Sequence, residues 1–183
     1  MSGDDVDGDV GSVEGLQALG FEGFVSVRDL RRDDCRSLPR ENGVYVLVRA
    51  RDGEPRFNVR GTAAFWRGQN PNVKVEELAE KWVPGALVMY VGRAAGTGVR
   101  GKLQQRVKRM LRFGEGKNVA HWGGRYVWQL ADAYDLKVAW KVCKDAVRWE
   151  VALLNAFAAK HEVLPFANLR DESGHSDYEE EPE

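Results

Sequence analysis

The sequence predicts a mixed α/β (α+β) fold, because short apolar segments typical of strands alternate with segments of helical period along its 183 residues. The segments 44–48 and 86–91 are almost wholly apolar and have the length of buried strands. The segments 102–113 and 146–161 instead repeat apolar residues at helical spacing, which gives each helix one face to bury. A chain of this length suits one domain with a hydrophobic core.

Shorter signals predict the remaining elements of the first half. Residues 21–27 favour an extended segment, and a short polar helix over 27–35 follows, with Ser26 as its N-cap. Residues 51–85 combine the glycine, proline and charge of a loop with a helix over 75–82. Because they separate two strands that a hairpin could join, we interpret 51–85 as an insertion.

Two further segments lie in the second half. Residues 136–142 alternate apolar and polar side chains, which predicts a half-buried strand. Residues 125–133 fit the period of a strand and that of a helix, so the residues alone leave this segment open.

The net charge of −1 hides an uneven distribution. Residues 1–15 carry five acids and residues 171–183 carry seven, and neither segment has a Lys or Arg. Without these twelve acids, 16 acids face 27 Lys and Arg, so residues 16–170 carry +11. A basic body between acidic ends predicts a polyanionic partner; the simpler alternative is a soluble domain whose ends offset its charge. We expect both ends to be disordered, with 16–38 as an N-terminal extension of the main domain.

Several classes are disfavoured by what the sequence lacks. It has no signal peptide and no apolar run near ~20 residues, so we expect neither secretion nor a membrane span. Two cysteines, Cys35 and Cys143, fit a reducing cytoplasm. With three histidines they do not predict a structural metal.

The strongest signal for a ligand lies after the 86–91 strand, where a glycine-rich segment leads into a basic helix. Seven cations and no acid lie between residues 93 and 112. Like charges three or four residues apart on a helix repel, so this density predicts an anionic partner, with phosphate as the first candidate. The candidates for DNA contact are Arg93, Arg100, Lys102 and Arg109.

Glu150 is the most informative acid, because it lies in the middle of the apolar face of the 146–161 helix. A carboxylate there costs several kcal/mol unless a cation or hydrogen bonds compensate it. Two interpretations remain open: a structural ion pair with an arginine, or an oxygen ligand of a divalent metal ion.

Four other side chains are candidates. Arg106 lies at the border of the apolar and basic stripes of its helix, where its stem can pack while its head faces a cleft. Tyr45 and Tyr90 lie in apolar strands, where a core tyrosine with a satisfied hydroxyl is a strong alternative. His121 could be a base, but nothing in the sequence fixes a partner for it, so we favour a simple loop residue.

Taken in order, these residues resemble those of the GIY-YIG endonucleases. Gly43-Val44-Tyr45 and Tyr90-Val91-Gly92 are similar to the two motifs of that family, each with valine in place of isoleucine. In the family an arginine, a metal-binding glutamate and an asparagine follow, and Arg106, Glu150 and Asn168 stand in that order here.

The resemblance covers about residues 39–170, with three departures. The gap between the motifs is long, and it contains the 51–85 insertion. The glycine-rich segment is also long, so Arg93 or Arg100 could take the place of Arg106. Many members carry a histidine four residues after the arginine, where this chain has Met110.

The resemblance implies a small antiparallel sheet flanked by helices, with 44–48 and 86–91 as central strands and 125–133 helical. It also implies hydrolysis of DNA phosphodiester bonds with Mg²⁺ or Mn²⁺. The alternatives are a nucleic-acid-binding module of the same fold that has lost cleavage, and a protein-binding adaptor that works through its acidic ends.

The resemblance also implies a role for each site residue. Tyr45 would take a proton from the attacking water, which requires nearby positive charge to lower its pKa from ~10. Arg106 would stabilise the charge on the phosphoryl oxygens, and Glu150 would bind the metal ion. Tyr90 would orient the water or the phosphate, and Asn168 would support the site from the end of the domain.

Overall fold

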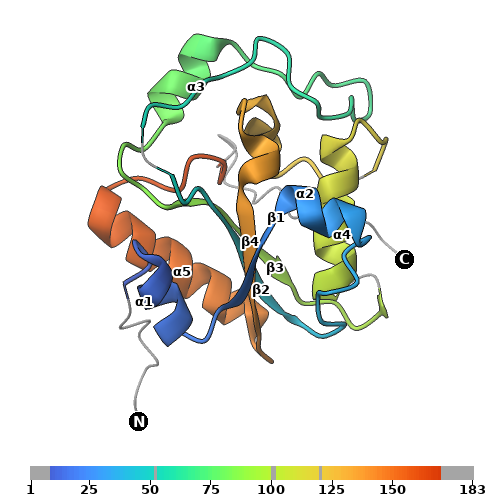
Figure 1. Ribbon diagram of the computed structural model, residues 1–183, viewed down its shortest axis with the longest axis vertical. Helices are drawn as coiled ribbons and strands as arrows, with labels where there is room; N and C mark the ends of the chain where they lie inside the picture. Colours follow the sequence, from blue (N-terminus) through green and yellow to red (C-terminus); the bar gives the residue numbers. More distant parts are fainter. Residues whose placement is uncertain (1–8, 52, 100–101, 120, 170–183) are drawn as a thin grey trace.

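The computed structural model describes residues 9–51, 53–99, 102–119 and 121–169. Its centre is a four-stranded antiparallel sheet in the order β1-β4-β2-β3 (Figure 1). The strands are β1 (Glu22–Ser26), β2 (Gly43–Val48), β3 (Val88–Ala94) and β4 (Lys137–Val142). The expected α+β class and the antiparallel sheet are therefore confirmed.

The expectation of two central strands is right for β2 and wrong for β3. β2 pairs with β3 on one side and β4 on the other, whereas β3 pairs with β2 alone among the described strands. β3 is nevertheless buried along most of its length, because both of its faces are covered. An apolar run indicates that both faces of a strand are buried. β3 shows that such a strand can still lie at the edge of the sheet.

Helices cover both faces of the sheet, as Figure 1 shows. α1 (Val13–Ala18) and α5 (Ala146–His161) lie on one face, and α2 (Val27–Arg32) and α4 (Leu103–Gly114) lie on the other. α3 (Val75–Lys81) lies beyond the end of the sheet. Among the described residues, no helix combines the length and the apolar character that crossing a bilayer requires.

Side-chain caps mark where α1, α2 and α5 begin. The Ser26 hydroxyl accepts a hydrogen bond from the Asp29 backbone N–H, and the Asp145 carboxylate accepts one from that of Arg148, as expected from their positions. Ser12 caps α1 in the same way. The expectation of disorder up to residue 15 is therefore wrong for residues 13–15, which begin this helix.

The segment 125–133, which the residues left open, is helical in its first part, and Leu130 then forms an isolated β-bridge with Phe57. It contains the 3₁₀ helix η2 (Arg125–Gln129) and leads into η3 (Ala133–Asp135). The Gln129 side chain binds the insertion: its amide donates to the backbone oxygens of Asn58 and Val73, and its oxygen accepts from the Val73 N–H. This buried amide thus joins the insertion to the domain, together with backbone hydrogen bonds such as that from the Thr62 N–H to the Trp128 oxygen.

Candidate functional site

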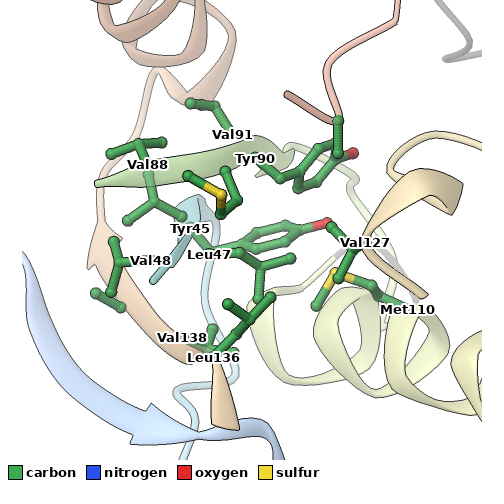
Figure 2. Packing of buried hydrophobic residues seen from close by; sticks show 14 of the residues in the cluster. Tyr45, Leu47, Val48, Val88, Tyr90, Val91, Met110, Val127, Leu136 and Val138 are labelled. Atoms are coloured by element: carbon green, nitrogen blue, oxygen red, sulfur yellow. The ribbon is translucent and has the colours of Figure 1, made fainter. Parts of the chain in front are cut away.

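Tyr45 and Tyr90 lie on the same face of the sheet, because of their register. Tyr45 is opposite Gly92, and Tyr90 is opposite Leu47. Side chains alternate along a strand, so residues two apart share a face. Figure 2 shows the two rings side by side on the face covered by α4, with their hydroxyls pointing in the same direction and Met110 nearby. Their ring centroids are 6.1 Å apart.

Gly92 leaves the space that the Tyr45 ring fills. A Cβ at residue 92 would lie 2.5 Å from Cζ and 2.6 Å from the hydroxyl oxygen of Tyr45. No side chain fits there unless the ring moves. Gly92 of the second motif is therefore required for the packing of Tyr45 of the first motif.

The pKa of Tyr45 is raised, whereas a role as a base requires it to be lowered. Burial raises the pKa of Tyr45 well above its usual value, Tyr90 and Glu150 raise it further, and Arg106 lowers it only in part. The lowered pKa that a base at Tyr45 requires is therefore not found. Its buried hydroxyl has no hydrogen-bond partner of normal geometry among the described residues.

Arg106 lies on α4, half-buried, and acts electrostatically on both Tyr45 and His121. Arg109 lies one turn further along and acts on His121 as well. Lys102, by contrast, donates hydrogen bonds to the Asn42 side chain and the Gly96 backbone oxygen, which hold the glycine-rich segment in place. Arg100 lies outside the described residues.

Glu150 is 2% exposed, and Arg93 is its ion-pair partner. The Arg93 Nη1 atom donates to Glu150 Oε2 at 2.5 Å, and the Arg93 side chain is 25% exposed. The other carboxylate oxygen, Oε1, is buried and has no hydrogen-bond partner among the described residues. Arg93, expected as a DNA contact, is thus also the counter-ion of the expected metal ligand.

The donor set at Glu150 fits a metal ion through one oxygen. Within the described part of the chain, no three His, Cys, Asp or Glu residues gather where they could hold a metal ion. Mg²⁺ is often held by one or two carboxylates, with water and substrate phosphate completing its coordination. The unpartnered Oε1 of Glu150 is the oxygen available for such a contact.

Asn168 closes the open edge of β3. Its side-chain oxygen accepts from the Val91 N–H at 2.8 Å, and its amide nitrogen donates to the Val91 oxygen at 2.9 Å. The adjacent Ala167 N–H donates to the Met89 oxygen. Asn168 therefore contacts β3 at the residue between Tyr90 and Gly92. Both polar atoms of its side chain are used in these hydrogen bonds to the backbone.

His121, which the sequence analysis favoured as a simple loop residue, is buried beside the two tyrosines. It is 6% exposed, and its ring centroid lies 6.3 Å from those of Tyr90 and Phe113. The following turn brings Gly124, at φ +76°, against the Tyr90 ring. The glycine pair after Trp122 was the only local signal of a tight turn, and the sequence does not say what that turn packs against.

Comparisons of the chain with models of protein families, with curated proteins and with solved structures find no match. The geometry alone therefore describes the site. It joins two tyrosine hydroxyls, a guanidinium and a buried carboxylate to a buried imidazole. Such a group of side chains can bind an anion, orient a water molecule and accept a proton.

Proposed function

We propose that the protein is a metal-dependent DNA endonuclease of the GIY-YIG type. One observation carries the proposal: Arg106 from α4 and Glu150 from α5 act electrostatically on the same Tyr45 hydroxyl, which lies beside Tyr90. Two helices on opposite faces of the sheet thus place a cation and an anion near one tyrosine, Tyr45. This is the combination that the motif resemblance implies.

The roles of the residues follow from their chemistry. Arg106 stabilises the negative charge that develops on the phosphoryl oxygens during in-line attack by water. The Tyr45 hydroxyl, whose pKa is raised by burial, remains protonated, and the Tyr45 and Tyr90 hydroxyls orient the water or the phosphate through hydrogen bonds. Asn168 holds β3, and with it Tyr90, in position. Glu150 would hold Mg²⁺ or Mn²⁺ through Oε1, and the bound ion would supply Lewis-acid stabilisation of the phosphate and the leaving oxygen.

DNA is the proposed substrate because of charge. The basic residues of α4 and the +11 of residues 16–170 favour a polyanion. The free thiols of Cys35 and Cys143 are compatible with the proposed cytoplasmic location.

The Arg93–Glu150 contact favours a second candidate, a nucleic-acid-binding module without cleavage. An ion pair of this kind compensates the buried carboxylate without any metal ion. In that case Glu150 would be structural, and DNA would bind through the basic residues alone.

A cleavage assay separates the two functions. The purified protein is incubated with supercoiled, linear and branched DNA, with Mg²⁺ and with EDTA. We expect Mg²⁺-dependent cleavage that falls at least about 10²-fold in Arg106→Ala, while DNA affinity stays nearly unchanged. Arg28→Ala is the control, because Arg28 is an exposed cation paired with Asp135. DNA binding without cleavage in any of these substrates would favour the second candidate.

A further inference from the structure

His121 lies beside Tyr90 of the proposed site, yet the proposed function gives it no role. Its ring contacts Tyr90 of β3 on one side and Phe113 of α4 on the other. The rings of Tyr45, Tyr90 and His121 therefore follow one another, with neighbouring centroids 6.1 Å and 6.3 Å apart.

One nitrogen of the His121 imidazole lacks a hydrogen-bond partner. Its Nε2 atom is buried and has no hydrogen-bond partner among the described residues. A buried polar atom without a partner destabilises the folded protein, so the unpartnered Nε2 beside the tyrosine pair points to a ligand or a bound water molecule. The tyrosine pair next to it is where the attacking water is proposed to lie.

Burial, and then the neighbouring charges, keep the imidazole of His121 unprotonated. Arg106 and Arg109 of α4 are the charges that act on it, while Tyr90 and Phe113 present rings. Burial, and then these two guanidinium groups, lower the pKa of His121 to about 3. In the free protein the imidazole is therefore neutral at every physiological pH, and in its Nδ1–H tautomer Nε2 is the lone-pair acceptor.

We propose that His121, and not Tyr45, accepts the proton of the attacking water during DNA hydrolysis. This inference rests on the proposed function. In the step, one O–H bond of the water breaks and its proton bonds to Nε2, while the oxygen lone pair forms the new bond to phosphorus. The bond from phosphorus to the leaving oxygen breaks, that oxygen takes a proton from solvent, and the imidazolium returns its proton to solvent.

The substrate itself makes this transfer favourable. A phosphate beside Arg106 cancels part of the positive charge that opposes protonation of the imidazole. His121 becomes a stronger base only when the anion is bound, which confines proton transfer to the complex.

Two variants and one titration test the proposal. His121→Phe keeps the ring packing without either nitrogen, and His121→Gln keeps a polar group that cannot accept a proton. Single-turnover cleavage, DNA affinity and melting temperature are measured for both, with His161→Gln as a control on α5 outside the site. In parallel, the His121 imidazole of the wild type is titrated by NMR in EDTA, with and without a short DNA duplex.

We expect both variants to cleave about 10²- to 10⁴-fold more slowly with DNA affinity unchanged, and the DNA complex to show a higher His121 pKa than the free protein. If the wild type cleaves DNA and folded variants cleave as fast, the proposal is overturned while the endonuclease function stands. An unchanged His121 pKa in the complex also overturns it, without any variant. A wild type that never cleaves overturns both.

Discussion

The Arg93–Glu150 pair is buried unequally, and this inequality decides what each side chain contributes. Glu150 is 2% exposed, whereas a quarter of the Arg93 side chain reaches solvent. A guanidinium that loses its partner can still be hydrated, but a carboxylate in the apolar face of α5 cannot. The free energy of unfolding should therefore respond more to Arg93 than to Glu150.

Arg93→Ala should lower the free energy of unfolding by about 3–5 kcal/mol, because it leaves a buried charge uncompensated. Glu150→Gln should lower it by only about 1–2 kcal/mol, and the double variant Arg93→Ala/Glu150→Gln should be more stable than Arg93→Ala. Urea denaturation measures all three. The opposite order of the single variants would contradict the burial described for the pair.

The same variants test whether Glu150 can hold a metal ion. Without Arg93 both carboxylate oxygens are open, so Mg²⁺ or Mn²⁺ should raise the melting temperature of Arg93→Ala more than that of the wild type. The double variant should lose this response. Equal metal effects in the single and the double variant would exclude Glu150 as the ligand.

His121 predicts a pH dependence of stability that is separate from activity. Its pKa is about 3 in the folded protein and near 6.5 when unfolded, so the unfolded chain binds the proton more tightly. The contribution of the unprotonated imidazole to the free energy of unfolding is complete above pH ~6.5 and is lost as the pH falls toward about 3. Between these limits the wild type should lose stability more steeply than His121→Phe. Parallel denaturation curves for the two proteins would contradict the burial of the imidazole.

At this scale the sequence identifies residues but not their partners. The position of Glu150 in an apolar face follows from helical period, which is local. Its contact with Arg93 joins residues 57 positions apart, and only the packing of α5 against β3 brings them together. His121 has no period around it, so nothing in the sequence indicates that it is buried.

Among the elements, β3 and β2 position the two tyrosines of the candidate site. A substitution at Gly92, which lies opposite Tyr45, tests this packing. Gly92→Ala would place a Cβ about 2.5 Å from the Tyr45 ring, so the ring must move. We expect a loss of about 1–3 kcal/mol in unfolding free energy and a large loss of cleavage. Gly98→Ala is the control, since a Cβ there meets open space. Wild-type stability and cleavage in Gly92→Ala would show that the ring has room.

Elements with a clear period or cap were predictable: β2, α2, α4 and α5 lie where the sequence places them. The edge position of β3 was not, because the side chain that closes the edge belongs to Asn168, far along the chain. The hydrogen bonds from the Gln129 side chain to Asn58 and Val73 of the insertion were equally unpredictable, because they all come from a single amide.

For the whole molecule, the distribution of charge predicts how DNA binds. Affinity should fall steeply with salt, with a log–log slope of about −0.9 for each phosphate contact. Removal of residues 1–8 and 171–183, which carry ten acids, leaves α1 intact and should tighten binding at low salt. Fluorescence anisotropy across a salt series measures both effects. An affinity that does not change with salt would remove the basis for a polyanionic substrate.

The central claim is that the residues around Tyr45 hydrolyse DNA with a metal ion held by Glu150. The most direct test is single-turnover cleavage by Glu150→Gln at saturating Mg²⁺, with Glu80→Gln on the exposed face of α3 as the control. We predict that folded Glu150→Gln binds DNA as the wild type does but cleaves it at least about 10²-fold more slowly, while Glu80→Gln cleaves normally. Cleavage by Glu150→Gln within a few-fold of the wild type would contradict the account.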